Sequence, residues 1–324
     1  MNETFYLCNM EVIRNGAVPK GTALVATVGS FDGVHAGHRF LIRALCEAGK
    51  ERSLPTAVIT FPHHPREVVR QAGYRLELLN SFEEKVALLS QTGVDYCIVL
   101  DFTPELAQLP ADAFIGKVLA DKLHVRTLLT GYDHHFGYNR TDGSAQYVEY
   151  GRRCGVEVLS VDYYGVGDTV VCSSGIRRLI ADGRVDDAAR LLTYEYRLHG
   201  KVTEGFHMGR KLGFPTANLC IDEPYKLLPQ AGVYAVYADV EGKRFMGMLY
   251  IGDRPTFGAT GDVSVEVHLL DFSGNLYGKE MTLSLVIFMR HGRKFANTAE
   301  LAAHLAIDQL KVRQLLEDPK TTAP

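Results

Sequence analysis

The sequence lacks the features of a membrane protein and of a nucleic-acid-binding protein. No apolar run reaches the roughly 18 residues that a membrane-spanning helix requires. The first residues contain no basic segment followed by an apolar core, so we expect no signal peptide. With the 12 histidines neutral, the net charge is −3, which indicates neither a nucleic acid nor a membrane surface as a partner.

Cysteine is scarce, and no two cysteines have the Cys-x-x-Cys spacing of a zinc or redox site. The scattered pattern argues against a disulfide framework and predicts reduced thiols in a cytoplasmic protein. The cysteines are Cys8, Cys46, Cys97, Cys154, Cys172 and Cys220. The 324 residues suffice for two domains, and the hydrophobic share of 46% is ordinary for a globular protein.

One stretch, residues 23–46, combines an apolar segment, a glycine-rich turn and a helical pattern. The segment ALVATVGS is typical of a buried strand. The turn and the helix N-terminus that follows suit a phosphate, because three glycines let the backbone approach it: Gly29, Gly33 and Gly37. His35 and His38 share a face of the helix. We interpret this pair as stabilising charge in phosphoryl or nucleotidyl transfer, and a purely structural junction is the alternative.

The rest of the first half alternates between strand and helix patterns. Such alternation predicts βαβ crossovers and a parallel sheet, whose ligands bind beyond the carboxyl ends of the strands. Strands are predicted at residues 56–61, 94–102, 125–133 and 156–164, and helices at 81–93, 110–123 and 143–155.

Polar clusters follow several of these predicted strands, at residues 62–66, 131–143 and 172–177. The last cluster begins another predicted helix, whose N–H groups together with Arg177 indicate a second phosphate site. The histidines of the first two clusters do not favour a metal site, because no acidic residue or cysteine accompanies them at ligand spacing.

Beyond residue 185, long strand patterns replace the alternation. Because no helix is predicted between these strands, they indicate a small antiparallel barrel closed by a last helix at 299–317, with Thr298 as its cap. A short helix at 186–192 precedes predicted strands at 196–205, 232–240, 243–252, 262–271 and 280–290, with a hairpin turn at Glu241-Gly242.

Two features of this half indicate chemistry. Residues 205–213 hold three glycines with Arg210 and Lys211 among them, which suits either a loop that covers phosphates or a simple surface loop. The alternation of strand 262–271 places Glu266 and His268 on one face. A carboxylate there is a candidate general base, and a solvated outer face is the alternative.

Taken together, the motifs resemble the prokaryotic bifunctional riboflavin kinase/FAD synthetase family over nearly the whole chain. In the first half the resemblance is carried by Gly29-x-Phe31-Asp32-Gly33-Val34-His35-x-Gly37-His38, Gly131-x-Asp133-x-x-Phe136-Gly137-x-x-Arg140 and Ser173-Ser174-x-Ile176-Arg177. In the second half it is carried by Gly213-Phe214-Pro215-Thr216-Ala217-Asn218, Gly232-Val233-Tyr234, Gly252-x-Arg254-Pro255-Thr256-Phe257, Glu266-x-His268-Leu269-Leu270-Asp271-Phe272 and Tyr277-Gly278. The ordered set is far more specific than any one member.

The resemblance implies an α/β fold with two domains. A Rossmann-like nucleotidylyltransferase domain, residues 1–184, would join FMN and ATP into FAD and pyrophosphate. A small antiparallel β-barrel with a C-terminal helix, residues 185–324, would be a riboflavin kinase that makes FMN with ATP. Mg²⁺ would assist, and the expected partners are riboflavin, FMN and ATP. We expect a monomer or weak homo-oligomer in the cytoplasm, with no nucleic acid or membrane partner.

The resemblance also implies a role for individual residues. His35 and His38 would stabilise the charge that develops in adenylyl transfer, and Glu266 would take the proton from the ribityl 5′-hydroxyl. Thr216 and Asn218 would position Mg²⁺. The residues implied to bind ATP are Gly29, Phe31, Asp32, Gly33, Gly37, Ser173, Ser174, Arg177, Gly205, Gly209, Arg210 and Gly213, and those implied to bind flavin are His64, Asp133, Phe136, Arg140 and Arg290.

The sequence departs from the family's pattern at several positions, and none of them is a proposed catalytic residue. These are Ser30 for Asn, His63 for Pro, His134 for Phe, Cys172 for Ser, Ser174 for Thr, Tyr250 for Asn and Gly292 for Glu. Two other functions stay open. The first domain would transfer a nucleotide to another phosphorylated compound, or the chain would sense flavin or nucleotide without turnover.

Overall fold

The chain forms two compact units, residues 1–173 and residues 174–324. Each unit has a hydrophobic core of its own. The computed structural model describes residues 3–7, 9–14, 18, 21–63, 77–132, 135–138, 142–166, 169–204, 208–253 and 263–317. Within those ranges, no helix combines the length and the apolar character needed to cross a bilayer.

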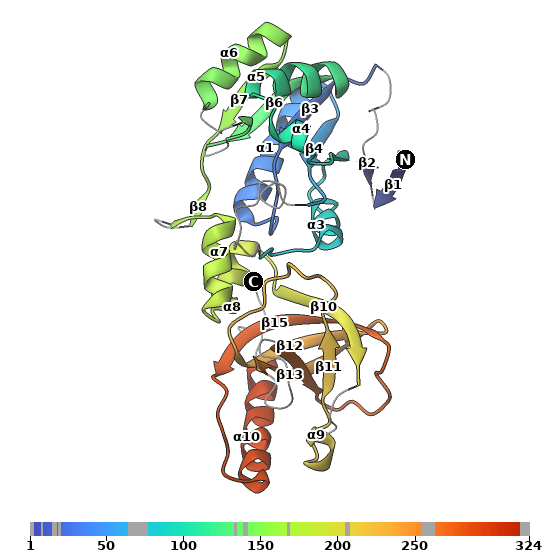
Figure 1. Ribbon diagram of the computed structural model, residues 1–324, viewed down its shortest axis with the longest axis vertical. Helices are drawn as coiled ribbons and strands as arrows, with labels where there is room; N and C mark the ends of the chain where they lie inside the picture. The colour runs from blue at the N-terminus through green and yellow to red at the C-terminus, as the bar shows by residue number, and fades with distance from the viewer. Residues whose placement is uncertain are drawn as a thin grey trace. The chain divides into compact units, whose positions relative to one another are not determined.

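The first unit is built on a sheet in which, among the described residues, six parallel strands are joined by one antiparallel edge strand, β1 (Figure 1). The predicted parallel sheet is thereby confirmed, although the two strands at the β1 edge were not predicted. In spatial order the strands are β1 (Glu3–Leu7), β2 (Met10–Arg14), β5 (Tyr96–Val99), β4 (Thr56–Thr60), β3 (Leu24–Val28), β6 (Val125–Gly131) and β7 (Glu157–Val161). Strands β3 and β4 are buried along their whole length, as central strands of a covered parallel sheet should be.

Helices connect these strands and pack against the sheet. Helix α1 lies on β3, β4 and β6, whereas Leu24, Ala26 and Val28 of β3 share a core cluster with residues of η1 and α6. The predicted helix at 110–123 is split into α5 and a π-helical segment, η1. The helices are α1 (Ala36–Arg52), α3 (Phe82–Leu89), α4 (Pro104–Ala107), α5 (Ala111–Ala113), η1 (Phe114–Lys122) and α6 (Ser144–Cys154).

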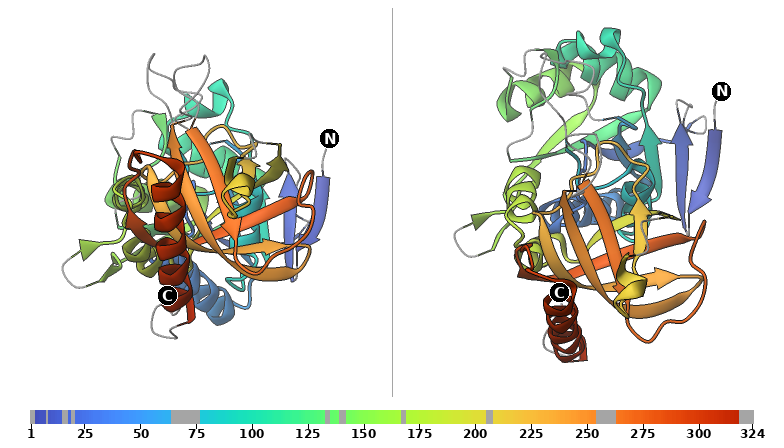
Figure 2. Two further views of the ribbon diagram at one scale, coloured as in Figure 1. Left: turned by 90° about the horizontal axis from the view of Figure 1, so that it is seen from below. Right: turned by 60° about the horizontal axis from the view of Figure 1, so that its bottom comes forward.

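The second unit contains a closed barrel of six described strands, all paired antiparallel, as the sequence predicted (Figure 2). One detail of the prediction was wrong, because a short helix, α9 (Met208–Lys211), lies between the first two strands. The hairpin turn is confirmed, since Glu241 and Gly242 both have positive φ, at 49° and 74°. Around the barrel the strands are β10 (Tyr196–Thr203), β11 (Ala217–Cys220), β14 (Val263–Leu269), β13 (Lys243–Asp253), β12 (Gly232–Val240) and β15 (Glu280–Arg290).

Helix α10 (Thr298–Glu317) packs on the outer side of β12 and β13. Its Val312 and Leu316 join a cluster with Met248 of β13. The cap of this helix is Asn297 and not Thr298, because the Asn297 side chain accepts a hydrogen bond from the Glu300 amide at 2.9 Å. The chain also forms α7 (Ser173–Ala181), α8 (Val185–Leu192) and a small hairpin of β8 (Gly165–Val166) and β9 (Thr169–Val170).

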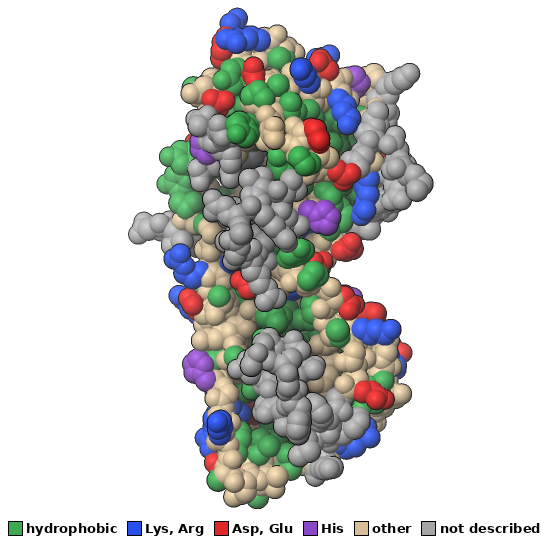
Figure 3. All heavy atoms as spheres, in the orientation of Figure 1, with side chains coloured by type: hydrophobic (Ala, Val, Ile, Leu, Met, Phe, Trp, Pro, Cys, Tyr) green, Lys and Arg blue, Asp and Glu red, His purple; other side chains and the backbone are tan. Residues whose placement is uncertain are grey.

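Basic and acidic side chains are interspersed over the face seen in Figure 3, and neither sign covers a large continuous area of its described residues. This distribution agrees with the small net charge of −3. A mixed surface of this kind produces no strong long-range field of either sign.

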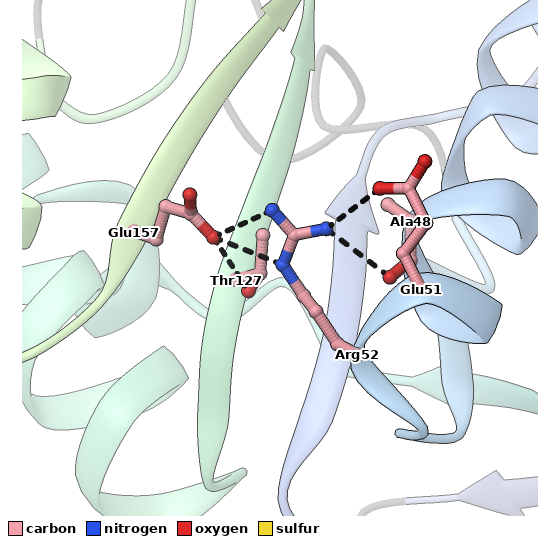
Figure 4. Close-up of polar contacts among 5 residues, drawn as sticks. All are labelled: Ala48, Glu51, Arg52, Thr127 and Glu157. Carbon is pink, nitrogen blue, oxygen red and sulfur yellow. Dashed lines mark hydrogen bonds and ion pairs between the residues drawn. The ribbon is translucent and has the colours of Figure 1, made fainter.

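The C-terminal end of α1 is tied to the sheet by Arg52 (Figure 4). Its Nε and Nη2 atoms lie 3.0 and 2.9 Å from Oε2 of Glu157, at the start of β7. The same carboxylate oxygen accepts a hydrogen bond from the Thr127 hydroxyl of β6 at 3.2 Å. Arg52 therefore fixes one end of the helix whose other end carries the histidine pair.

We expect Arg52→Met to lower the free energy of unfolding of the first unit by about 0.2–1 kcal/mol, the usual range for a partly exposed ion pair. Urea denaturation at low and high salt measures the change, and high salt should shrink it. Arg126→Met, at an exposed position of β6, is the matched control and should have a smaller effect. Equal effects of the two substitutions would contradict the anchoring role.

Candidate active sites

The turn between β3 and α1 has an unusual backbone. Phe31 and Val34 have positive φ values of 49° and 35°, and Gly33 has a φ of 88°. A positive φ is costly for a β-branched residue such as Val34, so the surrounding structure must hold it in place. Phe31 and Val34 are both buried, at 2% and 0% exposure. Packing therefore maintains a strained turn at the point where the sequence predicted a phosphate site.

Asp32 fastens this turn to its surroundings. Its carboxylate is buried and accepts hydrogen bonds from the amides of Leu79 and Asn80 at 2.9 and 3.3 Å. Its backbone carbonyl accepts a hydrogen bond from the Ser173 hydroxyl at 2.9 Å. Asp32 was predicted to bind ATP, and the described contacts give it the additional task of holding the turn against two distant segments.

The two histidines lie together at the start of α1. His35 caps the helix, because its Nδ1 atom accepts a hydrogen bond from the His38 amide at 3.3 Å. The rings are stacked, with centroids 3.7 Å apart and planes 17° from parallel. Since Nδ1 of His35 is an acceptor, a neutral ring carries its proton on Nε2 and can donate from that side. The predicted pair is thus confirmed as a spatial unit at a helix N-terminus, where anions are stabilised.

The neighbouring glycines are needed for close packing. A side chain at Gly29 would lie 3.0 Å from the Phe31 ring, and one at Gly37 would lie 3.2 Å from the Val171 carbonyl and 3.3 Å from the His35 ring. The Phe31 ring also meets His38 edge to face at 5.1 Å. Gly29, Gly37 and Phe31 therefore shape the histidine pair itself, whatever they contribute to a ligand.

A hollow lies beside the turn, at the carboxyl ends of β3 and β4. Within it the Lys85 ammonium donates to the carbonyls of Phe61 and Ser30 at 2.7 and 3.2 Å. Because Ser30 follows β3 and Phe61 follows β4, Lys85 joins the ends of two adjacent strands. The sequence pattern did not indicate a role for this residue, because its helical context is that of any surface lysine. The residues lining the hollow are Ser30, Asp32, Phe61, Pro62, His63, Leu78, Asn80, Ser81, Phe82 and Lys85.

We expect Lys85→Met to loosen the ends of β3 and β4, because it leaves two carbonyl acceptors without the ammonium, at a cost of about 1–3 kcal/mol. Hydrogen–deuterium exchange should become faster at residues 28–34 and 59–62. Lys50→Met, at an exposed position of α1, should leave exchange there unchanged. Unaltered protection of both segments in Lys85→Met would contradict the bridging role.

The other residues predicted for the first site differ in their placement. Ser173 begins α7, with Ser174 exposed and Arg177 half-buried in its first turns. Phe136 is packed between aromatic rings, with its ring stacked on Tyr147 at 4.1 Å and tilted against Phe114 at 5.6 Å. His64, Asp133 and Arg140, predicted to bind flavin, lie outside the described residues.

A second candidate site lies on the outer face of the barrel. Glu266 of β14 pairs directly with Asn218 of β11 on one side and with Tyr250 of β13 on the other. Residues paired across antiparallel strands point to the same face, with Cβ atoms about 4.5–5.5 Å apart. Val265 and Val267, on the opposite face, are buried at 5% and 0% exposure. Glu266 therefore lies half-buried outside the barrel, next to a residue predicted to bind Mg²⁺.

The segment before Asn218 is held by His268. Its Nδ1 atom lies 2.8 Å from the Pro215 carbonyl, and its ring meets Phe214 edge to face at 5.5 Å. Because a carbonyl oxygen can only accept, Nδ1 of His268 carries a proton. His268 is 6% exposed and shares its face with Glu266. It fixes the backbone immediately before Thr216, a task that residue spacing did not reveal.

The glycine-rich loop folds back toward Thr216. A side chain at Gly209 would lie 2.3 Å from the Phe214 carbonyl and 3.3 Å from the Thr216 hydroxyl. The Phe214 amide donates to the Gly209 carbonyl at 2.9 Å. Arg210 and Gly213 are exposed, and Gly213 has a φ of 83°. The described part of this loop thus adjoins the residues predicted to position metal and phosphate, and Gly205 lies outside the described residues.

Arg290, predicted to bind flavin, is engaged by α10. Its Nε and Nη2 atoms donate to Oδ2 of Asp308 at 3.0 and 2.6 Å. Asp308 is 2% exposed, so the pair is an inward-facing link between β15 and the last helix. A third donor, Nη1, bonds to the His291 carbonyl at 3.0 Å. The flavin role of Arg290 stays a prediction.

The cysteines that the structure describes are free thiols. Burial raises the pKa of the Cys97 thiol to about 12. Such a thiol is protonated at neutral pH and is a poor nucleophile. Over the described ranges, no group of three or more His, Cys, Asp or Glu side chains gathers at metal-ligand distances.

Comparisons with known proteins match both units. A family model described as FAD synthetase matches residues 18–175, and one described as riboflavin kinase matches residues 192–316. The chain is 35% identical to the bifunctional riboflavin kinase/FMN adenylyltransferase of Listeria monocytogenes, over 89% of this chain and 91% of that protein. It is also 35% identical to the protein of the same name from Escherichia coli, over 90% of this chain and 92% of that protein.

A solved structure is similar over nearly its whole length. It is the crystal structure of a protein from Streptococcus pneumoniae that is named as a macrolide-efflux protein. The TM-score is 0.84 at 26% sequence identity, covering 93% of this chain and 98% of that chain. The similarity extends over both units and supports the fold described above.

Proposed function

We propose that this chain, which belongs to the bifunctional riboflavin kinase/FMN adenylyltransferase family, converts riboflavin to FAD in two steps. The second unit phosphorylates riboflavin with ATP, giving FMN and ADP. The first unit then joins FMN to the adenylyl group of a second ATP, giving FAD and pyrophosphate. The observation that carries the proposal is that two units of unlike architecture each gather groups suited to phosphate chemistry.

In adenylyl transfer, an oxygen of the FMN phosphate attacks the α-phosphorus of ATP and pyrophosphate leaves. His35 and His38 stabilise the charge that develops on the phosphate oxygens. Their position at the N-terminus of α1 supports this role, because the positive end of the helix dipole favours an anion. Stacking at 3.7 Å fixes both rings relative to the turn before the reaction, so little reorganisation is required.

In the kinase reaction, Glu266 takes the proton from the 5′-hydroxyl of riboflavin, and the hydroxyl oxygen attacks the γ-phosphorus of ATP. Glu266 lies beside Asn218 on one face of the barrel. Thr216 and Asn218 supply neutral oxygen atoms, which suit a hard divalent cation held mainly by phosphates. We infer that they hold Mg²⁺, which when bound neutralises phosphate charge, and that Gly205, Gly209, Arg210 and Gly213 bind ATP.

The remaining assignments rest on the same family membership. We propose that Gly29, Gly33, Gly37, Ser173, Ser174 and Arg177 bind ATP in the first site, and that His64, Asp133, Phe136, Arg140 and Arg290 bind flavin. The functional domains are proposed as residues 1–184 and 185–324. We also propose a cytoplasmic monomer or weak homo-oligomer with no nucleic acid or membrane partner, which the small net charge of −3 supports.

One assay separates this proposal from its rivals. Purified protein is incubated with riboflavin, ATP and Mg²⁺, and the products are separated by chromatography. Successive appearance of FMN and FAD is the expected result. Flavin binding without product would instead favour a sensor. FMN formation without FAD, when FMN and ATP are both present, would favour another phosphorylated substrate for the first unit.

We expect Glu266→Gln to slow FMN formation by about 10²–10³-fold, because the amide cannot accept the proton of the hydroxyl. FAD formation from supplied FMN should persist, since that reaction belongs to the other unit. Glu280→Gln, at an exposed position of β15, is the matched control and should retain both activities. Loss of both activities in folded Glu266→Gln protein would contradict separate sites.

We expect His38→Ala to slow FAD formation by about 10²–10³-fold, the effect of removing one charge-stabilising donor in comparable sites. FMN formation measured on the same preparation reports whether the rest of the protein is intact, and should not change. Unchanged FAD synthesis in this variant would mean that the histidine pair is structural.

A further inference from the structure

Three side chains form a row across the outer face of the barrel. Strand β14 lies between β11 and β13, and Glu266 of β14 is directly paired with Asn218 and with Tyr250. Side chains paired in this way have Cβ atoms about 4.5–5.5 Å apart and point to the same side of the sheet. The row therefore runs in the order Asn218, Glu266, Tyr250.

The ring of Tyr250 has a defined place on this face. A Cβ atom at Gly252 would lie 2.3 Å from the Tyr250 hydroxyl, and a Cβ at Gly292 would lie 3.4 Å from the ring and from the hydroxyl. The ring thus extends over two glycines. It also packs against the hydrophobic cluster beneath α10 and stays half-buried. A ring supported in this way presents a rigid apolar surface and loses little conformational entropy when a ligand packs on it.

Tyr250 and Gly292 lie next to each other here, although they are far apart in the sequence. A Cβ atom at residue 292 would be in ordinary van der Waals contact with the Tyr250 ring, so Gly292 lies beside that ring.

The order of the row indicates which substrate meets the ring. In phosphoryl transfer the attacking and leaving oxygens lie roughly in line, on opposite sides of the phosphorus. With the donor phosphate held beside Asn218, the acceptor hydroxyl must reach Glu266 from the other side. Tyr250 occupies that side of Glu266.

We propose that Tyr250 is a specificity-determining residue for the acceptor of the kinase reaction. Its ring packs against riboflavin next to the hydroxyl that Glu266 deprotonates, and Gly292 lies beside the ring. This inference rests on the proposed kinase activity. It assigns the ring to the acceptor and not to ATP.

The test compares Michaelis constants for riboflavin and ATP, measured from the summed formation of FMN and FAD. We expect Tyr250→Leu to raise the KM for riboflavin about tenfold, because a lost aromatic contact weakens binding by about that factor. The KM for ATP should change less than about twofold. Tyr250→Phe keeps the ring and should behave like the parent protein. A tenfold rise in Tyr250→Phe would assign the contact to the hydroxyl and overturn the role of the ring.

Tyr237→Leu is the matched control. Tyr237 packs in the same cluster beneath α10, and its hydroxyl donates to the Leu316 carbonyl at 2.8 Å. We expect this change to lower the melting temperature without a selective rise in the KM for riboflavin. The inference is overturned if Tyr250→Leu raises both Michaelis constants equally, raises neither, or matches Tyr237→Leu.

A second measurement tests the contact between the two positions. Gly292→Glu places a side chain against the ring, so it should raise the KM for riboflavin in the parent protein and have a smaller effect in Tyr250→Asn. Additive effects would overturn the proposed coupling. If the parent protein makes no FMN, the proposed function fails; if it makes FMN and Tyr250→Leu keeps its riboflavin KM, only the present inference fails.

Discussion

The geometry of the candidate site in the first unit depends on how the strained turn between β3 and α1 is held in place. The chain must leave β3 and enter α1 with two non-glycine residues, Phe31 and Val34, at positive φ. Burial of both side chains and the hydrogen bonds of the Asp32 carboxylate hold this conformation. The cap formed by His35 depends on it, because Nδ1 reaches the His38 amide only when the turn ends at that residue. Strain of this kind persists at functional sites when the surroundings over-determine it.

In the second unit, the groups proposed to bind phosphate and metal are positioned by a different physical constraint. There is no long helix N-terminus at its proposed site, within the described residues, and α9 has only four residues. The register between neighbouring strands positions the groups instead. The pairing of β11 with β14 sets Asn218 beside Glu266. His268 then fixes the Phe214-Pro215 segment that leads into Thr216 and Asn218, the residues proposed to bind Mg²⁺. A register is rigid because slipping it by one residue would turn every buried side chain outward.

Two residues outside the histidine pair hold the surroundings of the first candidate site in place. Arg52 ties the distant end of α1 to β6 and β7, and Lys85 joins the ends of β3 and β4. Neither was found from the sequence, because an arginine at the end of a helix and a lysine within one are ordinary surface residues in a pattern. Their partners are backbone carbonyls and a carboxylate more than 20 residues away, and no local rule predicts such distances.

The sequence by itself determined the two architectures, since period-2 and helical patterns report which faces are buried. It also determined the histidine pair and the hairpin turn at Glu241-Gly242, because both depend on neighbouring residues. Only the tertiary structure decided that α9 interrupts the barrel strands, that Asn297 caps α10, and that Phe136 is packed between two rings. It alone brought Tyr250 and Gly292 into contact. Such contacts depend on strand register and on segments distant in the chain, which no short stretch of sequence encodes.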